Sequence, residues 1–394
     1  MLSKLQRAGR FQLPLPMLAL AAACLLIACG DERSAERSAA GERVRVSEAL
    51  SGEAEAEGYA RALGPRAFLF PWDHGAHPAY RHEWWYTTGN LESEDGRHFG
   101  FQVTFFRIAL APSAAARPSA WATRQLWMAH FTVTDTQGER FYHFERFARG
   151  ALGLAGAEAD PFRVWLEDWA LEGEPGAGMD QLQATLEAEG VGLDLSLAAR
   201  KPLILQGDRG YSRKGAEPGN ASYYYSLPRL AVEGRVVLPD GAHRVTGSAW
   251  IDREWGSSAL SEGQAGWDWF SLQLEDGSEL MVYHLRQADG RSDPHSAGTW
   301  IDASGRKRSL DPEDFELEVL ECWRSPDGGA RYPIRWRVRY PAEGLDLELR
   351  PTLADQELRG GFRYWEGAVR GEGRRQGAPV RAVGYVEMTG YADE

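Results

Sequence analysis

The amino-acid sequence predicts a mainly β protein of the sandwich or barrel type. Segments rich in β-forming residues alternate with D-G, Q-G and S-G turns, whereas convincing helical periodicity is scarce. In "IRWRVRY", residues 334–340, apolar side chains alternate with three arginines, which is typical of a half-buried antiparallel strand. All 15 tryptophans lie at or after Trp72, as expected of sheets that carry aromatic surfaces.

Two hairpin-like segments suggest an internal repeat within this β region. "WWYTTGNLESEDGRHFGFQV" and "WDWFSLQLEDGSELMVYHL" each contain an aromatic-rich strand, an acidic D-G turn and a second strand. Trp84 aligns with Trp267, and Tyr86 aligns with Trp269. The alternative is a chance resemblance between two hairpins. A true repeat would mean two similar β domains in tandem.

Length and composition divide the chain after residue 29 into a tether and two domains. Its 394 residues are enough for two ordinary domains with their own cores. We expect an N-terminal domain over residues 67–240 and a C-terminal domain over residues 241–394, with the boundary at the turn-rich "VVLPDGAHRVTG". Residues 30–66 are rich in Ala, Glu, Ser, Gly and Arg and nearly lack aromatics, which predicts a flexible tether.

The first 29 residues resemble a bacterial lipoprotein signal peptide. A basic start without acids precedes a short apolar stretch that ends in "LIAC", with Leu26 at −3 and the small Ala28 at −1 of Cys29. This resemblance implies that Cys29 is lipidated and becomes the first mature residue. Gly30 at position +2 implies the outer membrane of a Gram-negative bacterium, facing the periplasm. The alternative is an ordinary secretory signal.

Charge and cysteine content exclude some classes of partner and bond. Loss of the signal peptide leaves 41 basic and 57 acidic residues, a net charge near −16. Such a charge argues against a nucleic-acid partner and against flat binding to anionic lipid. Only Cys322 then remains as a free thiol, so a disulfide within the mature chain is excluded.

Four stretches combine acidic with aromatic residues and are the candidates for chemistry. A carboxyl group against indole surface loses solvation, which raises its pKa and suits it to donate a proton near neutral pH. The candidate catalytic acids are Glu83, Asp252 and Glu254. The candidate ligand-binding residues are Trp84, Trp85, Tyr86, Tyr223, Tyr225, Trp250, Trp255, Trp267, Asp268 and Trp269.

The competing interpretation is that each acid forms an ordinary ion pair. Arg81, Arg107, Arg253 and Arg286 are the obvious partners. Arg253 directly follows Asp252, and we expect such a neighbour to keep a carboxylate ionised.

Neither a metal site nor a common nucleophile motif is predicted. "HPAYRHE" contains two histidines and an acid, but not in the helical H-E-x-x-H arrangement. A G-x-S-x-G motif is also missing from the sequence. "LQGDRGYSRKG", residues 205–215, lacks the strand and helix of a phosphate-binding loop, so we interpret it as a loop that lines a site.

Seven motifs occur in the order found in one known protein family. They are "HEWWYTTGNL", "GRHFGFQVTFFR", "LILQGDRGYSRKG", "YYYSLPRL", "AWIDREW", "GWDWFSLQLEDGSELM" and "GYVEMTGY". From about Phe68 to Tyr391 the chain resembles the carotenoid 1,2-hydratase and AttH-like family, also described as predicted secreted hydrolases. The resemblance implies two tandem lipocalin-like antiparallel β-barrel domains, no metal or organic cofactor, and an apolar ligand.

The resemblance also implies candidate roles for individual residues. Hydratases of this family protonate a terminal alkene of an acyclic carotenoid and add water to the resulting cation. By motif the acid would be Asp252, with Trp250 and either Tyr223 or Tyr225 lining the site. No nucleophile that would support the "hydrolase" description is visible in this sequence.

Three functions follow as expectations. The first is an AttH-like envelope lipoprotein, anchored to the membrane by its lipid, that binds a lipid or isoprenoid. The second is a cofactor-independent hydratase that adds water to an alkene by acid catalysis. The third is a structural envelope protein whose aromatic motifs only pack a domain interface.

Overall fold

The structure is a computed structural model that describes residues 57–392 except 114–118, 259 and 262. The predicted signal peptide, Cys29 and most of the predicted tether therefore lie outside the described residues. Within the described part the chain is all-β, with two one-turn 3-10 helices, η2 (Trp72–His74) and η3 (Pro341–Glu343). The same part contains no helix with the length and apolar character needed to cross a membrane. The predicted all-β class is confirmed.

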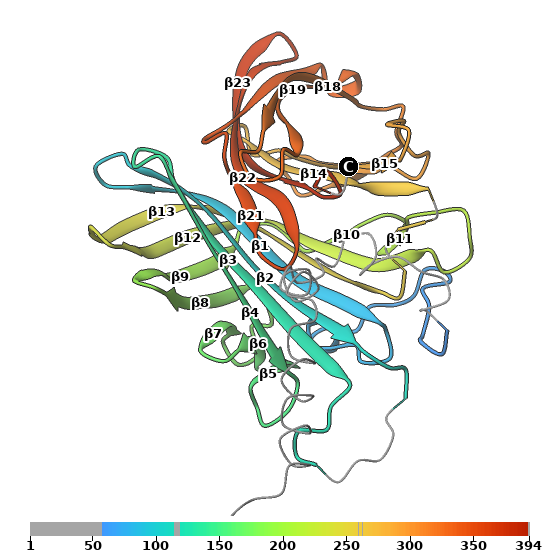
Figure 1. The fold of residues 1–394 in the computed structure, drawn as a ribbon. Helices are drawn as coiled ribbons and strands as arrows, with labels where there is room; N and C mark the ends of the chain where they lie inside the picture. The colour runs from blue at the N-terminus through green and yellow to red at the C-terminus, as the bar shows by residue number, and fades with distance from the viewer. Residues whose placement is uncertain (1–56, 114–118, 259, 262, 393–394) are drawn as a thin grey trace, which may run out of the picture. The chain divides into compact units, whose positions relative to one another are not determined.

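The first sheet contains thirteen strands of the described chain and is coloured blue to yellow in Figure 1. Its strand order is β4-β3-β2-β1-β13-β12-β9-β8-β7-β6-β5, and β10 and β11 pair with β12. The strands are β1 (His82–Ser93), β2 (His98–Ala109), β3 (Gln125–Asp135), β4 (Arg140–Arg149), β5 (Ala155–Ala159), β6 (Phe162–Leu166), β7 (Trp169–Gly173), β8 (Gln181–Ala188), β9 (Val191–Ala199), β10 (Ile204–Leu205), β11 (Tyr211–Arg213), β12 (Ala221–Leu238) and β13 (Gly241–Gly256).

The second sheet contains ten strands of the described chain and is coloured orange to red. Its order is β17-β16-β15-β14-β23-β22-β20-β19-β18, and β21 pairs with β22. The strands are β14 (Gln264–Leu274), β15 (Glu279–Gln287), β16 (Ala297–Ile301), β17 (Lys307–Leu310), β18 (Glu316–Arg324), β19 (Arg331–Tyr340), β20 (Leu345–Pro351), β21 (Glu357–Arg359), β22 (Arg363–Arg375) and β23 (Ala378–Met388).

The boundary between the two sheets differs from the predicted boundary between residues 240 and 241. The D-G turn at Asp240 and Gly241 joins β12 to β13 in an antiparallel hairpin of the first sheet. The two sheets instead divide between Gly256 and Gln264. Turn residues at a hairpin and at a domain boundary look alike in a sequence, so composition alone did not separate them.

The last part of the predicted tether packs on the first sheet instead of hanging free. Ala62 is fully buried in the first core. The Tyr59 hydroxyl donates to the Ala109 carbonyl at 2.8 Å, and the Tyr223 hydroxyl donates to the Gly64 carbonyl at 3.1 Å. Residues 57–66 therefore belong to the folded body, contrary to the prediction.

Each sheet encloses its own apolar core. In the first core Trp85, Trp169 and Trp255 are fully buried. In the second, Trp336 and Trp365 are buried with aliphatic side chains from the surrounding strands. The two-residue period of a β-strand sends alternate side chains into these cores and leaves the others on the opposite face of the sheet.

A third buried cluster lies where the two sheets meet, and we call this contact region the seam. Its largest side chains are Tyr86, Tyr224, Trp250, Trp269, Tyr283 and Tyr385. Polar groups also bond across it: Asn90 Nδ2 donates to the Gly384 carbonyl at 3.0 Å, and Thr134 Oγ1 donates to Gln356 Oε1 at 2.8 Å. Because the seam is buried and hydrogen-bonded, it holds side chains from both sheets in fixed positions.

The two sheets have matching topologies, which gives the predicted internal repeat a structural counterpart. The strand order β2-β1-β13-β12 of the first sheet corresponds to β15-β14-β23-β22 of the second. The predicted repeat segments form the hairpins β1–β2 and β14–β15. Tyr86 and Trp269, which align in the repeat, meet across the seam with ring centroids 5.1 Å apart.

A close approach at the seam predicts the effect of adding one methyl group. A Cβ placed on Gly100 of β2 would lie 2.5 Å from the Cβ of Ala368 on β22. We therefore expect Gly100→Ala to force the sheets apart and to lower the free energy of unfolding by about 1–3 kcal/mol, measured by urea denaturation. Gly64→Ala, whose Cβ would meet nothing within 4 Å, is the control. Equal stabilities for the two variants would contradict this packing.

Candidate functional site

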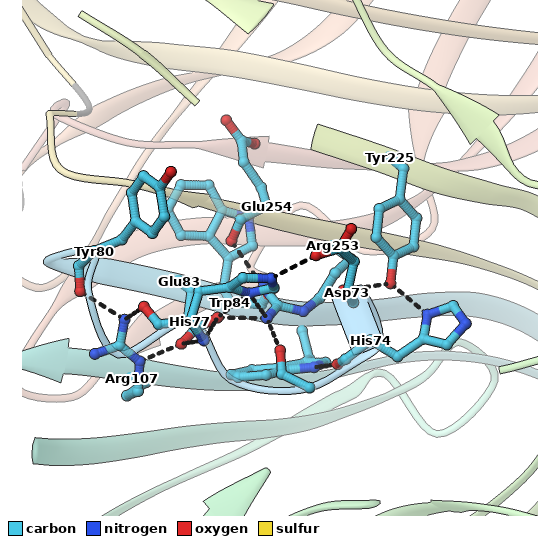
Figure 2. A network of polar contacts seen from close by, with 12 residues as sticks. Asp73, His74, His77, Tyr80, Glu83, Trp84, Arg107, Tyr225, Arg253 and Glu254 are labelled. Carbon is cyan, nitrogen blue, oxygen red and sulfur yellow. Dashed lines mark hydrogen bonds and ion pairs between the residues drawn. The ribbon is translucent and has the colours of Figure 1, made fainter. Parts of the chain in front are cut away.

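Glu83 lies at the centre of a buried ion cluster on the core side of the first sheet (Figure 2). Its carboxylate accepts hydrogen bonds from Arg107 of β2 and Arg253 of β13. The backbone N–H of His77 donates to the same carboxylate at 2.9 Å. Glu83 and Arg253 are fully buried, and Arg107 is 1% exposed. The cluster thus connects three neighbouring strands without access to solvent.

Neighbouring groups hold the two arginines of this cluster in place. Arg107 Nη2 donates to the carbonyls of His77 and Tyr80 at 3.0 and 2.8 Å. The Arg253 guanidinium lies 3.8 Å from the centre of the Trp85 ring. Burial would raise the pKa of Glu83, but attraction to Arg253 and Arg107 outweighs burial and holds that pKa well below its usual value. Glu83 is therefore a permanent anion with a structural role, not a proton donor.

Asp252 occupies the opposite face of β13 and has no arginine partner among the described residues. Alternation along β13 sends Arg253 to the core, whereas Asp252 faces the seam. Trp250 Nε1 donates to Asp252 Oδ1 at 2.7 Å, and the Ser226 hydroxyl donates to the same oxygen. The Tyr224 hydroxyl donates to Asp252 Oδ2 at 2.6 Å. The predicted effect of Arg253 on Asp252 is wrong, because neighbours in a strand point to opposite faces.

The surroundings of Asp252 favour its neutral form. Burial raises the pKa of Asp252 to about 7, against the opposing effect of the Ser226, Tyr224 and Trp250 hydrogen bonds. A carboxyl oxygen has two acceptor positions. Trp250 and Ser226 fill both positions on Oδ1, and Tyr224 fills one on Oδ2, so one position on Oδ2 is left for an acid proton.

Asp252 opens into a cavity of about 100 Å³ at the seam, which we call the main cavity. Aromatic rings from both sheets form most of its wall. They are Trp84, Tyr86, Phe106, Tyr224, Trp267, Trp269 and Tyr283.

A charged pair lies at the wall of the main cavity. Lys214 Nζ lies 3.3 Å from Glu254 Oε1, and the Ser222 hydroxyl donates to the same oxygen. Burial would lower the pKa of Lys214, but attraction to Glu254 outweighs it and the pKa is raised. Lys214 comes from the segment 205–215 that the sequence predicts to line a site.

A second cavity of about 60 Å³, which we call the side cavity, shares part of its wall with the main cavity. The shared residues are His82, Trp84, Phe106, Trp267 and Glu387. His82 is 3% exposed, and neither ring nitrogen has a hydrogen-bond partner in the described part of the chain. Burial lowers the pKa of His82 to about 3, so its ring is neutral and can bond a polar group of a ligand.

With this geometry established, comparisons with known proteins assign the chain to a family. A model of AttH-like proteins matches residues 61–391, which is most of the chain. The chain belongs to the AttH-like family. A comparison with curated proteins found no match.

Two solved structures share the fold of this AttH-like protein. A protein from Nitrosomonas europaea assigned as an AttH is 38% identical, with a TM-score of 0.74 over 84% of this chain and 99% of the other. Kievitone hydratase from Nectria haematococca is 15% identical, with a TM-score of 0.64 over 88% of this chain and 98% of the other. The family and the all-β fold of two tandem lipocalin-like barrels are confirmed, each sheet forming a barrel or half-barrel.

The structure brings six of the predicted site residues of the AttH-like protein together around the main cavity. They are Trp84, Tyr86, Asp252, Glu254, Trp267 and Trp269. Trp250 lies directly behind them, because it contacts Trp269 and donates to Asp252.

Other predicted site residues lie elsewhere. Trp85, Tyr223, Tyr225 and Trp255 belong to the first core, because strand alternation turns them away from the seam. Asp268 pairs with Arg286 at 3.2 Å and accepts from the Tyr391 hydroxyl at 3.2 Å. Its predicted place in a ligand site is therefore wrong for the main cavity, and the alternative of an arginine pair holds for both Asp268 and Glu83.

Sequence reasoning missed several residues of the site. Tyr224, not Tyr223 or Tyr225, faces Asp252, and the pairing of Ser226 with Asp252 between β12 and β13 determines this. Glu387 lies in the motif "GYVEMTGY", which contains no tryptophan of the kind that marked the other candidate acids. Strand alternation alone does not show which of the three tyrosines faces Asp252. That also requires the register of β12 against β13, which cannot be deduced from the sequence. Within the described residues, no group of three or more His, Cys, Asp or Glu side chains is arranged to hold a metal ion.

The ion cluster predicts a large stability loss when its acid is neutralised. Glu83→Gln would leave Arg107 and Arg253 buried without a counter-charge, so we expect the free energy of unfolding to fall by about 3–5 kcal/mol in urea denaturation. Glu172→Gln removes an ion pair with Arg163 in which both side chains are more than 40% exposed, and it should change the same quantity by less than about 1 kcal/mol. A small effect of Glu83→Gln would show that the cluster is not structural.

The raised pKa of Asp252 predicts a pH-dependent difference in stability. The unfolded carboxyl ionises near pH 3.8 and the folded one near pH 7, so folding loses stability as the pH rises through that interval. Asp252→Asn stays neutral, so its stability relative to wild type should increase by roughly 2–4 kcal/mol between pH 4 and 8. Urea denaturation at several pH values measures this difference. A difference that does not change with pH would mean that Asp252 is ionised in the folded protein.

Proposed function

We propose that this AttH-like protein is a hydratase that adds water to a carbon–carbon double bond of an apolar substrate. The observation that carries the proposal is Asp252, a buried carboxyl that has no cationic partner in the described residues and opens into an aromatic cavity. A carboxyl that is still protonated near pH 7 can act as a general acid under physiological conditions.

The chemistry proceeds in two steps. The Asp252 O–H bond breaks and its proton forms a C–H bond at the less substituted alkene carbon, which leaves a tertiary cation. A water oxygen then forms a C–O bond with the cation, and the proton that this water loses restores the acid form of Asp252. Trp84, Trp267 and Trp269 line the main cavity, and such aromatic rings stabilise a nearby cation because the negative face of an aromatic ring attracts positive charge.

The sizes of the cavities limit the substrate. About 100 Å³ of main cavity accommodates the reacting end of an acyclic isoprenoid and a water molecule, but not the whole chain of a carotenoid. The side cavity lies next to it, shares Trp84 and Trp267 as wall residues and adds further apolar wall. We therefore infer that an elongated apolar substrate inserts one end at Asp252. Kievitone hydratase is by its name a hydratase, but at 15% identity its likeness supports the fold, so the proposal rests on Asp252.

Binding of an apolar lipid or isoprenoid without turnover is the second candidate function. The aromatic walls of the two cavities favour it, since such walls also suit a carrier. Its distinguishing feature is that Asp252 would affect retention of the ligand but not its chemistry.

We also propose, from the "LIAC" sequence, that lipid on Cys29 anchors the protein in the cell envelope, on the periplasmic side of the outer membrane. An apolar substrate dissolved in that membrane would then be close to the protein.

The hydratase proposal predicts that the purified protein converts an acyclic carotenoid with a terminal trisubstituted alkene to its monohydroxylated product. In ¹⁸O-labelled water the product should carry the label, as detected by mass spectrometry. Asp252→Asn should lower kcat/KM by about 10²- to 10⁴-fold, because the general acid is lost. Asp289→Asn, at an exposed turn, is the matched control.

A second variant tests the environment of the acid. Tyr224→Phe removes a hydrogen bond that stabilises the Asp252 carboxylate, so the pH above which activity is lost should move upward. Equal rates for Asp252→Asn and wild type would overturn the proposal. A carotenoid that is retained but unchanged by both proteins would support the binding function.

A further inference from the structure

A second carboxyl group faces the cavities from the second barrel. Glu387 of β23 belongs to the walls of both the main and the side cavity. Trp267 Nε1 donates to Glu387 Oε1 at 2.7 Å. Its other oxygen, Oε2, has no hydrogen-bond partner within the described part of the protein. The carboxyl is thus anchored by one oxygen and free to bond a cavity water with the other.

The register of the strands makes Glu387 the counterpart of Asp252. In the first sheet Asp252 pairs with Tyr86, and in the second sheet Glu387 pairs with Trp269. Tyr86 and Trp269 occupy equivalent positions of the repeated hairpins. Each acid also accepts a hydrogen bond from an indole, Asp252 from Trp250 and Glu387 from Trp267. Each barrel therefore contributes an acid without a paired cation among the described residues, from an equivalent position, to one cavity.

A third acid stands directly beside Glu387 in the sheet. Glu366 of β22 pairs with Glu387 across the strands and is fully buried. The Tyr86 hydroxyl donates to Glu366 Oε1, whereas no described residue forms a hydrogen bond with Glu366 Oε2. Within the described residues neither acid forms an ion pair with lysine or arginine. Two adjacent carboxyls, of which Glu366 is fully and Glu387 partly buried, do not both ionise readily, because each charge raises the pKa of the other group.

The titration of these acids follows from their surroundings. Burial and the neighbouring Glu387 raise the pKa of Glu366 well above its usual value, so Glu366 stays neutral. Burial raises the pKa of Glu387 to about 7, opposed by the Trp267 hydrogen bond and supported by Asp252 and Glu254. The other titratable groups at the walls of the two cavities are His82, Glu83, Tyr86, Arg107, His130, Lys214, Tyr224, Tyr283 and Tyr364, and Arg107 is bound to Glu83. Lys214 is already paired with Glu254, and His82 is neutral.

We propose that Glu387 is a second catalytic residue, the base that takes the proton from the attacking water while Asp252 supplies the proton to the alkene. This inference rests on the proposed hydratase function. In the reaction the Asp252 O–H bond breaks as a C–H bond forms, and a water oxygen forms the C–O bond. One O–H bond of that water breaks as its proton moves to the Glu387 carboxylate. The proton later returns from Glu387 to Asp252 through cavity water, and the net change is addition of H and OH to the alkene.

The proposal requires Asp252 protonated and Glu387 ionised at the same time, which predicts a bell-shaped dependence of kcat/KM on pH, centred near neutrality. Glu387→Gln keeps an acceptor for Trp267 but cannot take a proton. We expect this variant to lose about 10²-fold in kcat/KM and to lose the acidic limb of the profile, while the basic limb from Asp252 remains. Glu372→Gln, an exposed position on β22, is the matched control and should keep the full bell.

A measurement without turnover tests Glu387 in the unaltered protein. With ¹³C-labelled glutamate, one carboxyl resonance should titrate near pH 7, move on addition of an apolar alkene, and vanish from the spectrum of Glu387→Gln. Titration of Glu387 at the ordinary pH of a glutamate would overturn its role, even if the variant failed to fold. Hydration by a Glu387→Gln protein with an unchanged pH profile would overturn Glu387 alone and leave the hydratase standing. Absence of hydration by the wild type would overturn the hydratase and, with it, this role.

Discussion

The ion cluster around Glu83 is the interaction on which the rest of the structure depends. Its carboxylate connects β1 to Arg107 on β2 and to Arg253 on β13. In a β-sheet a shift of one residue exchanges every side chain between the two faces. By holding β13 in register, the cluster keeps Arg253 and Trp255 in the first core and sends Asp252 to the seam. The Glu83 cluster thus determines the position of Asp252, to which we assign a catalytic role, although Glu83 itself takes no part in the proposed reaction.

The buried carboxyl groups discussed above lie in two opposite electrostatic environments. Two arginines surround Glu83 and favour its anion, whereas Asp252 and Glu387 have hydrogen bonds and aromatic neighbours but no paired cation in the part of the chain that the structure describes. A buried acid without a cation destabilises the folded state at neutral pH, and a structural role would be served better by an apolar side chain. Because Asp252 and Glu387 carry this cost in stability and lie at a cavity wall, we favour a role for them in proton transfer over one in packing.

The sequence predicted those features that depend on local pattern and missed those that depend on register. Alternation and D-G turns correctly indicated strands and hairpins, and the aromatic motif identified Trp84, Trp267 and Asp252 as neighbours of a site. The same D-G signal at Asp240 misplaced the boundary, because a hairpin and a linker use the same residues. The partners of Asp252 and of Glu387 follow from strand pairing and from contacts between the two barrels. Strand pairing and contacts between barrels both join residues far apart in the sequence, so a short sequence motif does not reveal them.

The repeat explains why the site lies at the seam and why it is not symmetric. Equivalent strands bring Asp252 and Glu387 to one cavity, so neither barrel contains the site alone. Their cross-strand neighbours differ, because Ser226 faces Asp252 where Glu366 faces Glu387. The serine donates a hydrogen bond and helps to fill the acceptor positions of Asp252, which orients its remaining proton. The neutral Glu366 donates nothing to Glu387, which leaves one oxygen of Glu387 open to water. Different neighbours at equivalent positions thus favour a proton donor in one barrel and a proton acceptor in the other.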